Sequence, residues 1–182
     1  MLTGKKVELR PFRRTDLANF VKWFNDPEVT QYLTLYLPMT EMAEEKWIEN
    51  LAGNPGTDVY FVIEAIENNG NKAIGSISLN GIHPKDHYAT FGIAIGEKEY
   101  WSKGYGTEAC RLIVKYGFEQ LNLHRISSIA YAFNERSLRM HLAAGFQEEG
   151  RRREMAFKNG KYADVVVFGL LRKEWQENVK RR

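Results

Sequence analysis

The fold is decided by residues 88–109, which read YATFGIAIGEKEYWSKGYGTEA. The apolar start predicts a strand over 88–95, and the polar, glycine-bearing stretch 96–106 predicts a turn. An apolar stripe then predicts a helix over 107–121, and a second strand is expected over 125–133. Because a strand, a helix and a strand in this order form a right-handed crossover, the two strands should be parallel neighbours.

The segments on either side predict further strands and helices. Asn-Gly at 69–70 favours a tight hairpin turn, and Asn134 and Gly145 are typical residues for the start and the end of a helix. The segment 28–38 has apolar residues without a clean period, which indicates a mobile loop over a site. Expected strands lie at 7–10, 59–66, 72–79, 147–157 and 162–171; expected helices lie at 15–25, after a Thr15–Asp16 cap, and at 40–51, through Trp47, Ile48 and Leu51.

The whole pattern predicts a mixed α/β (α+β) fold of one domain over residues 1–182. The chain is 43% hydrophobic and 27% charged, so disordered and fibrous classes are excluded. The first twenty residues are charged throughout, and no apolar run approaches the length of about 18 that a membrane span needs. We therefore expect a soluble, cytoplasmic protein with no membrane partner.

The charge distribution and the cysteine content indicate which partners and which chemistry to expect. The net charge is +3, and the tail from Arg172 to Arg182 holds five of the basic residues. Without the tail the charges balance, so a nucleic-acid partner is not expected and a solvated terminal helix is favoured. The single cysteine, Cys110, cannot form an internal disulfide, and we expect it to be buried and not catalytic.

The glycine turn can hold an anion. Gly104 and Gly106 precede a helix, whose first N–H groups are unpaired and carry partial positive charge. A phosphate or pyrophosphate therefore fits there, and Lys103 and Thr107 could add donors. The spacing is neither a Walker loop nor a full dinucleotide fingerprint, so a purely structural turn stays an equal alternative on these residues alone.

The stretch Trp101–Gly106 is similar to the pyrophosphate loop of the GNAT superfamily of acyl-CoA N-acyltransferases, Gln/Arg-x-x-Gly-x-Gly/Ala, with Trp101 replacing the first residue. Further similarity is found in these short stretches: Leu9–Pro11, Asn25–Val29, Leu121–Ile126, Asn134–Ser137, Gly145–Phe146, Glu149–Gly150 and Asn159–Asp164. The combined pattern resembles the branch that includes the ribosomal-protein N-terminal acetyltransferases. It implies a mostly antiparallel sheet with a splayed central parallel strand pair, flanked by helices.

The resemblance implies acetyl-CoA as co-substrate and no metal. Ile93 and Ile95 would pair their backbone with the pantetheine arm, and Ile93 or Ala94 would donate an N–H to the oxyanion. Asn134 and Ser137 would contact the pantetheine, although Asn134 is also a good helix cap. The full set of implied cofactor residues is Ile93, Ala94, Ile95, Trp101, Ser102, Lys103, Gly104, Tyr105, Gly106, Thr107, Asn134 and Ser137.

Two catalytic residues are expected. His141 stands where the family often has a tyrosine that protonates the departing thiolate, so His141 is the candidate acid, with a packed helical histidine as the alternative. Thr90 stands where related sequences often carry a glutamate. Glu64, on an apolar strand, is then the candidate general base, with a paired edge glutamate as the alternative. Glu97, His83 and His87 are weaker candidates.

The resemblance implies an N-acetyltransferase in which a primary amine attacks the thioester directly in a ternary complex. The branch favours a protein or peptide N-terminal α-amine, as in ribosomal-protein-alanine acetylation. The alternative is a polyamine or antibiotic amine, held by acidic side chains such as Asp58, Glu64 or Asp86. A non-catalytic CoA-binding regulatory module is the alternative of another class, and a homodimer is possible.

Overall fold

The computed structural model describes residues 2–36, 38–43, 45–46 and 56–180. One eight-stranded sheet runs through them in the order β1-β2-β3-β4-β5-β6-β8-β7. The strands are β1 Leu2–Thr3, β2 Val7–Arg10, β3 Val59–Ala65, β4 Lys72–Asn80, β5 Tyr88–Ile95, β6 Arg125–Tyr131, β7 Gln147–Lys158 and β8 Lys161–Leu171. The helices are η1 Arg14–Asp16, α1 Leu17–Phe24, α2 Pro27–Thr30, η2 Lys98–Tyr100, α4 Tyr105–Glu119, α5 Glu135–Ala144 and α6 Arg172–Lys180.

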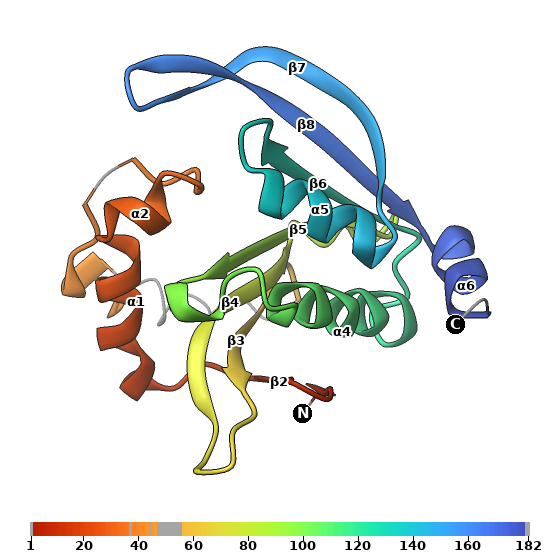
Figure 1. Cartoon of the computed structure of the whole chain (residues 1–182). Helices are drawn as coiled ribbons and strands as arrows, with labels where there is room; N and C mark the ends of the chain where they lie inside the picture. Colours follow the sequence, from red (N-terminus) through yellow and green to blue (C-terminus); the bar gives the residue numbers. More distant parts are fainter. Residues whose placement is uncertain (1, 37, 44, 47–55, 181–182) are drawn as a thin grey trace.

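Helices cover both faces of the sheet. Helix α4 connects β5 to β6, the parallel pair of the sheet, and lies beside α5 in front of the sheet in Figure 1. Helix α1 packs Phe20 and Trp23 on Val62, while the next residue of β3, Ile63, belongs to the core shared with α4. Since neighbouring strand residues point to opposite faces, α1 and α4 lie on opposite sides of the sheet.

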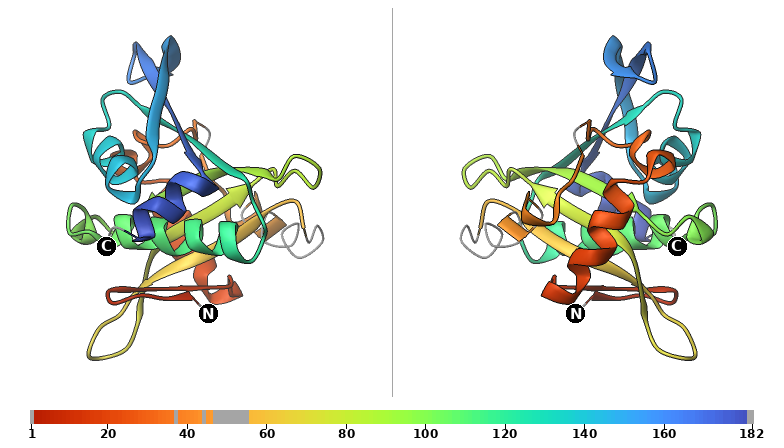
Figure 2. Two further views of the ribbon diagram at one scale, coloured as in Figure 1. Left: turned by 90° about the vertical axis from the view of Figure 1, so that its right-hand side faces the viewer. Right: turned by 90° about the vertical axis from the view of Figure 1, so that its left-hand side faces the viewer.

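The strands β7 and β8 form a long hairpin; β8 pairs with β6, and the far part of the hairpin projects beyond the sheet (Figure 2). At the other end of β8, helix α6 packs Trp175 against Phe118 of α4 at 5.3 Å between ring centroids. Among the described residues, no helix is long and apolar enough to cross a membrane.

The observed elements confirm the expected mixed sheet with its parallel β5–β6 pair. Helix α4 begins at Tyr105 and not at 107, because left-handed Gly104 already lets the chain turn into the helix. The short strand β1 and helix α2 were not expected. Asp16 was expected to cap α1, but its carboxylate pairs with Arg10 instead. In the expected helix 40–51, residues 41–43 and 45–46 are helical, whereas Trp47, Ile48 and Leu51 lie outside the described residues.

Candidate active site

The parallel strands β5 and β6 part after three residue pairs, from Tyr88↔Arg125 to Thr90↔Ser127. Beyond that point β5 stays paired with β4 as far as Ile95, and β6 stays paired with β8 as far as Tyr131. Each strand therefore keeps its outer partner and leaves its inner edge without a ladder. We call this region, β5 from residue 91 and β6 from residue 128, the splay.

The backbone of β5 presents alternate residues to the splay. The Phe91 carbonyl accepts a hydrogen bond from Ser128 of β6, and the Ile95 carbonyl accepts one from the indole of Trp101 at 2.7 Å. Because backbone groups alternate between the two neighbours of a strand, Ile93 must face the splay as well. Ala94, in register with Ser76 of β4, directs its backbone the other way. Of the two expected oxyanion donors, the geometry thus favours Ile93.

The glycine turn lies at the end of the splay and begins α4. Gly104 has φ of +87°, in the left-handed region, and serves as the N-cap of the helix. A side chain at Gly106 would meet Ile93 at 3.7 Å, Ile95 at 3.8 Å and Met140 of α5 at 4.0 Å. Gly106 therefore lines the gap between β5 and α5, beside the unpaired N–H groups of the first turn of α4.

The turn between β1 and β2 is hydrogen-bonded to the first turn of α4. Three backbone N–H groups, of Lys5, Lys6 and Val7, donate to the carboxylate of Glu108 at 2.9, 2.7 and 3.1 Å. The Lys6 ammonium donates to the carbonyl of Lys103 at 3.0 Å, which brings a second lysine to the glycine turn. Sequence reasoning missed Lys6, because nothing in the local sequence links residues about one hundred positions apart.

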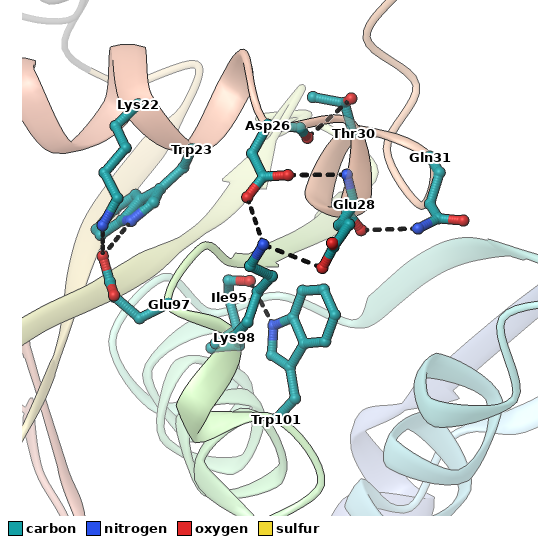
Figure 3. Close-up of polar contacts among 10 residues, drawn as sticks. All are labelled: Lys22, Trp23, Asp26, Glu28, Thr30, Gln31, Ile95, Glu97, Lys98 and Trp101. Carbon is teal, nitrogen blue, oxygen red and sulfur yellow. Dashed lines mark hydrogen bonds and ion pairs between the residues drawn. The ribbon is translucent and has the colours of Figure 1, made fainter.

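A stack of side chains crosses the end of the splay. The guanidinium of Arg136, on the first turn of α5, lies 4.0 Å from the ring centroid of Trp101 and 4.8 Å from that of Tyr32. Trp101 is itself fixed to β5 through the bond to Ile95, as Figure 3 shows. Trp101 stands where the family has Gln or Arg, and the guanidinium of Arg136 packs on its indole ring. Arg136 was not anticipated from the sequence.

The segment that follows α2 lies against the end of β6 and against β7. The Tyr131 hydroxyl donates to the carbonyl of Leu33 at 3.2 Å, and the Lys158 ammonium donates to the carbonyls of Thr30 and Leu35 at 3.2 and 2.7 Å. The segment expected to be a mobile loop over a site is therefore tied, in its described residues, to both β6 and the hairpin.

Helices α1 and α2 are joined to the end of β5 (Figure 3). Glu97 accepts hydrogen bonds from Lys22 and from the indole of Trp23, each at 2.7 Å. Burial raises the pKa of Glu97, but these two bonds outweigh it and the net shift is downward, so Glu97 is held as a carboxylate and not poised as a base. Lys98 bridges Asp26 at 2.9 Å and Glu28 at 3.0 Å.

We expect Lys98→Ala to loosen α2. The Val29 and Thr30 amides, which donate to the Asp26 carbonyl at 3.0 and 2.9 Å, should exchange their hydrogens about two- to five-fold faster, the range for exposed ion pairs. Added salt should shrink the difference by screening the charges. Lys115→Ala, which removes another surface lysine, is the control. Unchanged exchange in Lys98→Ala would show that the bridge does not hold α2.

Two of the expected cofactor residues lie at the start of α5. The side-chain oxygen of Asn134 accepts from the backbone N–H of Ser137 at 3.2 Å, so Asn134 caps the helix. This leaves the amide NH₂ of Asn134 without a described partner. The cap and a cofactor contact are therefore compatible in one side chain.

His141 does not reach the surface of the splay. Its side chain is buried, with the residue 1% exposed, and its ring stacks on Phe168 at 4.5 Å. Burial lowers its pKa, and both ring nitrogens already lie within hydrogen-bond distance of Ser137 and Ser128. A ring placed in this way has no free nitrogen for a thiolate. The structure thus favours the packed-histidine alternative over the expected acid.

Glu64 is paired and not free. Arg10 donates from Nε to Glu64 at 2.5 Å, and its two terminal nitrogens donate to both oxygens of Asp16 at 2.7 Å. Glu64 lies on β3, two strands from β5 and therefore about 10 Å away, on the face that α1 covers. This placement favours the paired-glutamate alternative over the expected base.

The remaining side chains singled out from the sequence lie elsewhere. Asp58 accepts from the backbone of Gly81 at 2.6 Å, and Asp86 pairs with His83 near the start of β5, away from the splay. Cys110 is fully buried, and burial raises the pKa of its thiol, as expected for a residue without a nucleophilic role. In the part of the chain that the structure describes, no group of histidine, cysteine and carboxylate side chains could hold a metal ion.

Two acidic residues to which the sequence analysis gave no role, Glu154 and Asp164, lie beside the end of β6. The Asp164 backbone accepts from Ala132, just past β6, and its carboxylate accepts from the N–H of Glu154 at 2.9 Å. Glu154 lies in a bulge of β7 with φ of +51°, a strained value for a residue with a side chain. Arg153, Glu154 and Asp164 line a cavity of about 620 Å³.

Comparison with known proteins agrees with this geometry. The family profile described as "Acetyltransferase (GNAT) domain" matches residues 6–147. The chain is 29% identical to the spermidine N(1)-acetyltransferase of Escherichia coli (strain K12) over 168 residues, 91% of this chain and 86% of that protein. It is 38% identical to YdaF of Bacillus subtilis (strain 168), provisionally named a ribosomal N-acetyltransferase, over 102 residues, 56% of this chain and 55% of YdaF.

The solved structures show the same fold. The spermidine N-acetyltransferase from Vibrio cholerae, crystallised with CoA and spermine, superposes with a TM-score of 0.86 at 25% identity. The match covers 95% of this chain and 99% of that one. The expected fold, the resemblance and the enzyme class are thereby confirmed: the chain belongs to the GNAT acetyltransferase family and is an acetyl-CoA-dependent N-acetyltransferase.

Proposed function

We propose that this enzyme acetylates a primary amine of a polyamine, with acetyl-CoA bound in the splay. The observation that carries the acceptor class is the half-buried carboxylate of Asp164 beside the end of β6, which lines a cavity of about 620 Å³ together with Glu154 and Arg153. A polyamine has further ammonium groups besides the one that reacts, and buried or half-buried carboxylates are the partners such groups need. The likeness to spermidine acetyltransferases over nine-tenths of the chain supports the same class.

Acetyl-CoA fits the splay for three reasons. The N–H groups that begin α4, with Lys103 and Lys6 nearby, suit a pyrophosphate. The lack of a side chain at Gly106 leaves room for an extended arm between β5 and α5. The backbone of Ile93 and Ile95 faces that arm. The cofactor supplies the thioester; the Ile93 N–H is positioned to stabilise the oxyanion when the amine attacks.

Neither carboxylate considered as the general base is free. Glu64 is bonded to Arg10, and Glu97 is bonded to Lys22 and Trp23. We therefore infer that the ammonium proton leaves to water, so that turnover rises with pH as the neutral fraction of the amine grows.

The acceptor is tested by following thiol release from acetyl-CoA with spermidine, spermine, a simple monoamine and a peptide with an N-terminal alanine. We expect turnover with the two polyamines, at kcat/KM at least about tenfold above the monoamine, the effect of one charge-assisted contact. Turnover with the peptide alone would contradict the polyamine proposal and would indicate a protein N-terminus as the acceptor, as the sequence resemblance favoured. Tight acetyl-CoA binding without any thiol release would contradict both acceptors.

The substitution Asp164→Asn tests the contribution of the negative charge on Asp164. The asparagine oxygen can still accept from the Glu154 N–H, so the bulge should persist while the negative charge is lost. We expect the KM for spermidine to rise about five- to twenty-fold with the KM for acetyl-CoA unchanged. The matched control is Asp86→Asn, at the far end of β5, which should leave both KM values as in the wild type. Equal effects of the two variants would remove Asp164 from the acceptor site.

A further inference from the structure

The narrow end of the splay contains a buried polar pair that the chemistry above does not use. Ser128, on β6, is 3% exposed and follows Ser127, the last residue of that strand paired with β5. His141, on α5, is 1% exposed. Each buried polar group must find a hydrogen-bond partner or destabilise the fold, so the contacts of this pair show what it does.

The hydrogen bonds fix the protons. The Nδ1 of His141 lies 2.7 Å from the carbonyl of Ser137, which can only accept, so Nδ1 carries a proton. Burial lowers the pKa of the ring, which is then neutral, and its other nitrogen, Nε2, is an acceptor. The hydroxyl of Ser128 lies 2.8 Å from Nε2 and 3.2 Å from the carbonyl of Phe91. One hydroxyl proton thus lies between the ring and the β5 backbone.

Aromatic rings hold the imidazole in place. It stacks on Phe168 at 4.5 Å and meets the edges of Phe91 and Phe146 at 5.6 and 5.4 Å. His141 therefore has one orientation, and through Nε2 it gives Ser128 one orientation as well.

We propose that Ser128 and His141 are positioning residues that end the β5–β6 ladder and hold the splay open for acetyl-CoA. If the two strands stayed paired, the Phe91 carbonyl would accept an N–H from the β6 backbone. The Ser128 hydroxyl oxygen lies in that place, 3.2 Å from the carbonyl, and its one proton is shared between this carbonyl and Nε2 of His141. A β6 N–H could therefore pair with Phe91 only by displacing Ser128 from His141. The inference rests on the proposed placement of acetyl-CoA in the splay.

The test is acetyl-CoA binding by calorimetry, which needs no acceptor. We expect Ser128→Ala and His141→Phe to raise the Kd about tenfold, the effect of one hydrogen bond, and Ser128→Thr, which keeps the hydroxyl, to stay within about threefold. Ile126→Val is the matched control, because it removes one buried methylene two residues away on the same face of β6 and touches no hydrogen bond. Its Kd should equal that of the wild type.

Wild-type affinity in Ser128→Ala, or an equal loss in Ile126→Val, would overturn the proposal. The nitrogen resonances of His141 give a second readout: Nδ1 should be the protonated nitrogen, and the Nε2 signal should shift when acetyl-CoA is added, because Ser128 connects it to the splay. An Nε2 signal that does not shift when acetyl-CoA is added would also contradict the proposal. If Gly106→Val abolishes binding while Ser128→Ala does not, the cofactor placement stands and only this inference fails.

Discussion

Gly106→Val is expected to weaken acetyl-CoA binding about 100-fold or more, equivalent to about 2.7 kcal/mol, while leaving the protein folded. The valine Cβ would lie 3.7–4.0 Å from Ile93, Ile95 and Met140, which is ordinary contact, so the fold can accept it. Its two methyl groups extend further into the gap between β5 and α5. An extended cofactor arm needs that same space, and a packed interior does not yield by a whole side chain.

Calorimetry with acetyl-CoA measures this effect, and urea unfolding checks that stability changes by less than about 1 kcal/mol. Gly106→Ala is the matched control, because a single methyl at these distances leaves most of the gap open, and its Kd should stay within about threefold of the wild type. If the valine variant is stable and binds acetyl-CoA normally, the cofactor does not pass Gly106.

Asp16→Ala is expected to lower the free energy of unfolding by about 3–5 kcal/mol, since it leaves a buried guanidinium without its main partner. The Arg10 side chain is 5% exposed, and both of its terminal nitrogens bond to Asp16 at 2.7 Å. An arginine side chain stays protonated even without this partner, so the variant keeps the buried charge. The Glu64 carboxylate and the Pro11 carbonyl then remain as its partners.

Urea unfolding of Asp16→Ala against Asp86→Ala measures this cost. Asp86 is an exposed loop residue whose removal should change stability by about 0.5 kcal/mol or less. A loss below about 1 kcal/mol in Asp16→Ala would show that water or another group replaces the carboxylate. The acetyl-CoA affinity of the folded variant should be unchanged, because the Arg10 cluster lies on the α1 side of the sheet, two strands from the splay.

The sequence predicts those parts of the molecule whose structure depends on interactions between residues close together in the chain. The β5 strand, the glycine turn and α4 follow from periodicity and from the backbone freedom of Gly104 within about thirty residues. Asn134 and Gly145 were identified as helix ends because capping is a contact between near neighbours.

For His141 and Glu64 the sequence left two alternatives open, because the choice depends on distant neighbours. The surroundings of His141 come from Phe91, Phe146 and Phe168, which lie on different elements and bury the ring. Glu64 was a candidate base or a paired glutamate, and its partner Arg10 lies 54 residues away in the sequence.

The acceptor side shows the same limit. Asp164 lies in a stretch that resembles the family, but its position beside the bulge at Glu154 could not be predicted, because two strands must be in register before the bulge forms. Lys6 and Arg136 likewise reach the glycine turn and Trp101 only through the folded sheet. The acceptor contacts proposed for this chain are thus ones that tertiary structure creates.

The most direct test of the account is to follow the backbone amide resonances during titration with acetyl-CoA. We predict large shifts at the amides of Ile93, Ile95, Tyr105, Gly106 and Thr107, which face the splay or begin α4, and little change at Asp16 and Glu64 on the α1 side. Shifts gathered on the α1 side, with the splay amides unmoved, would contradict the placement of the cofactor on which the whole account depends.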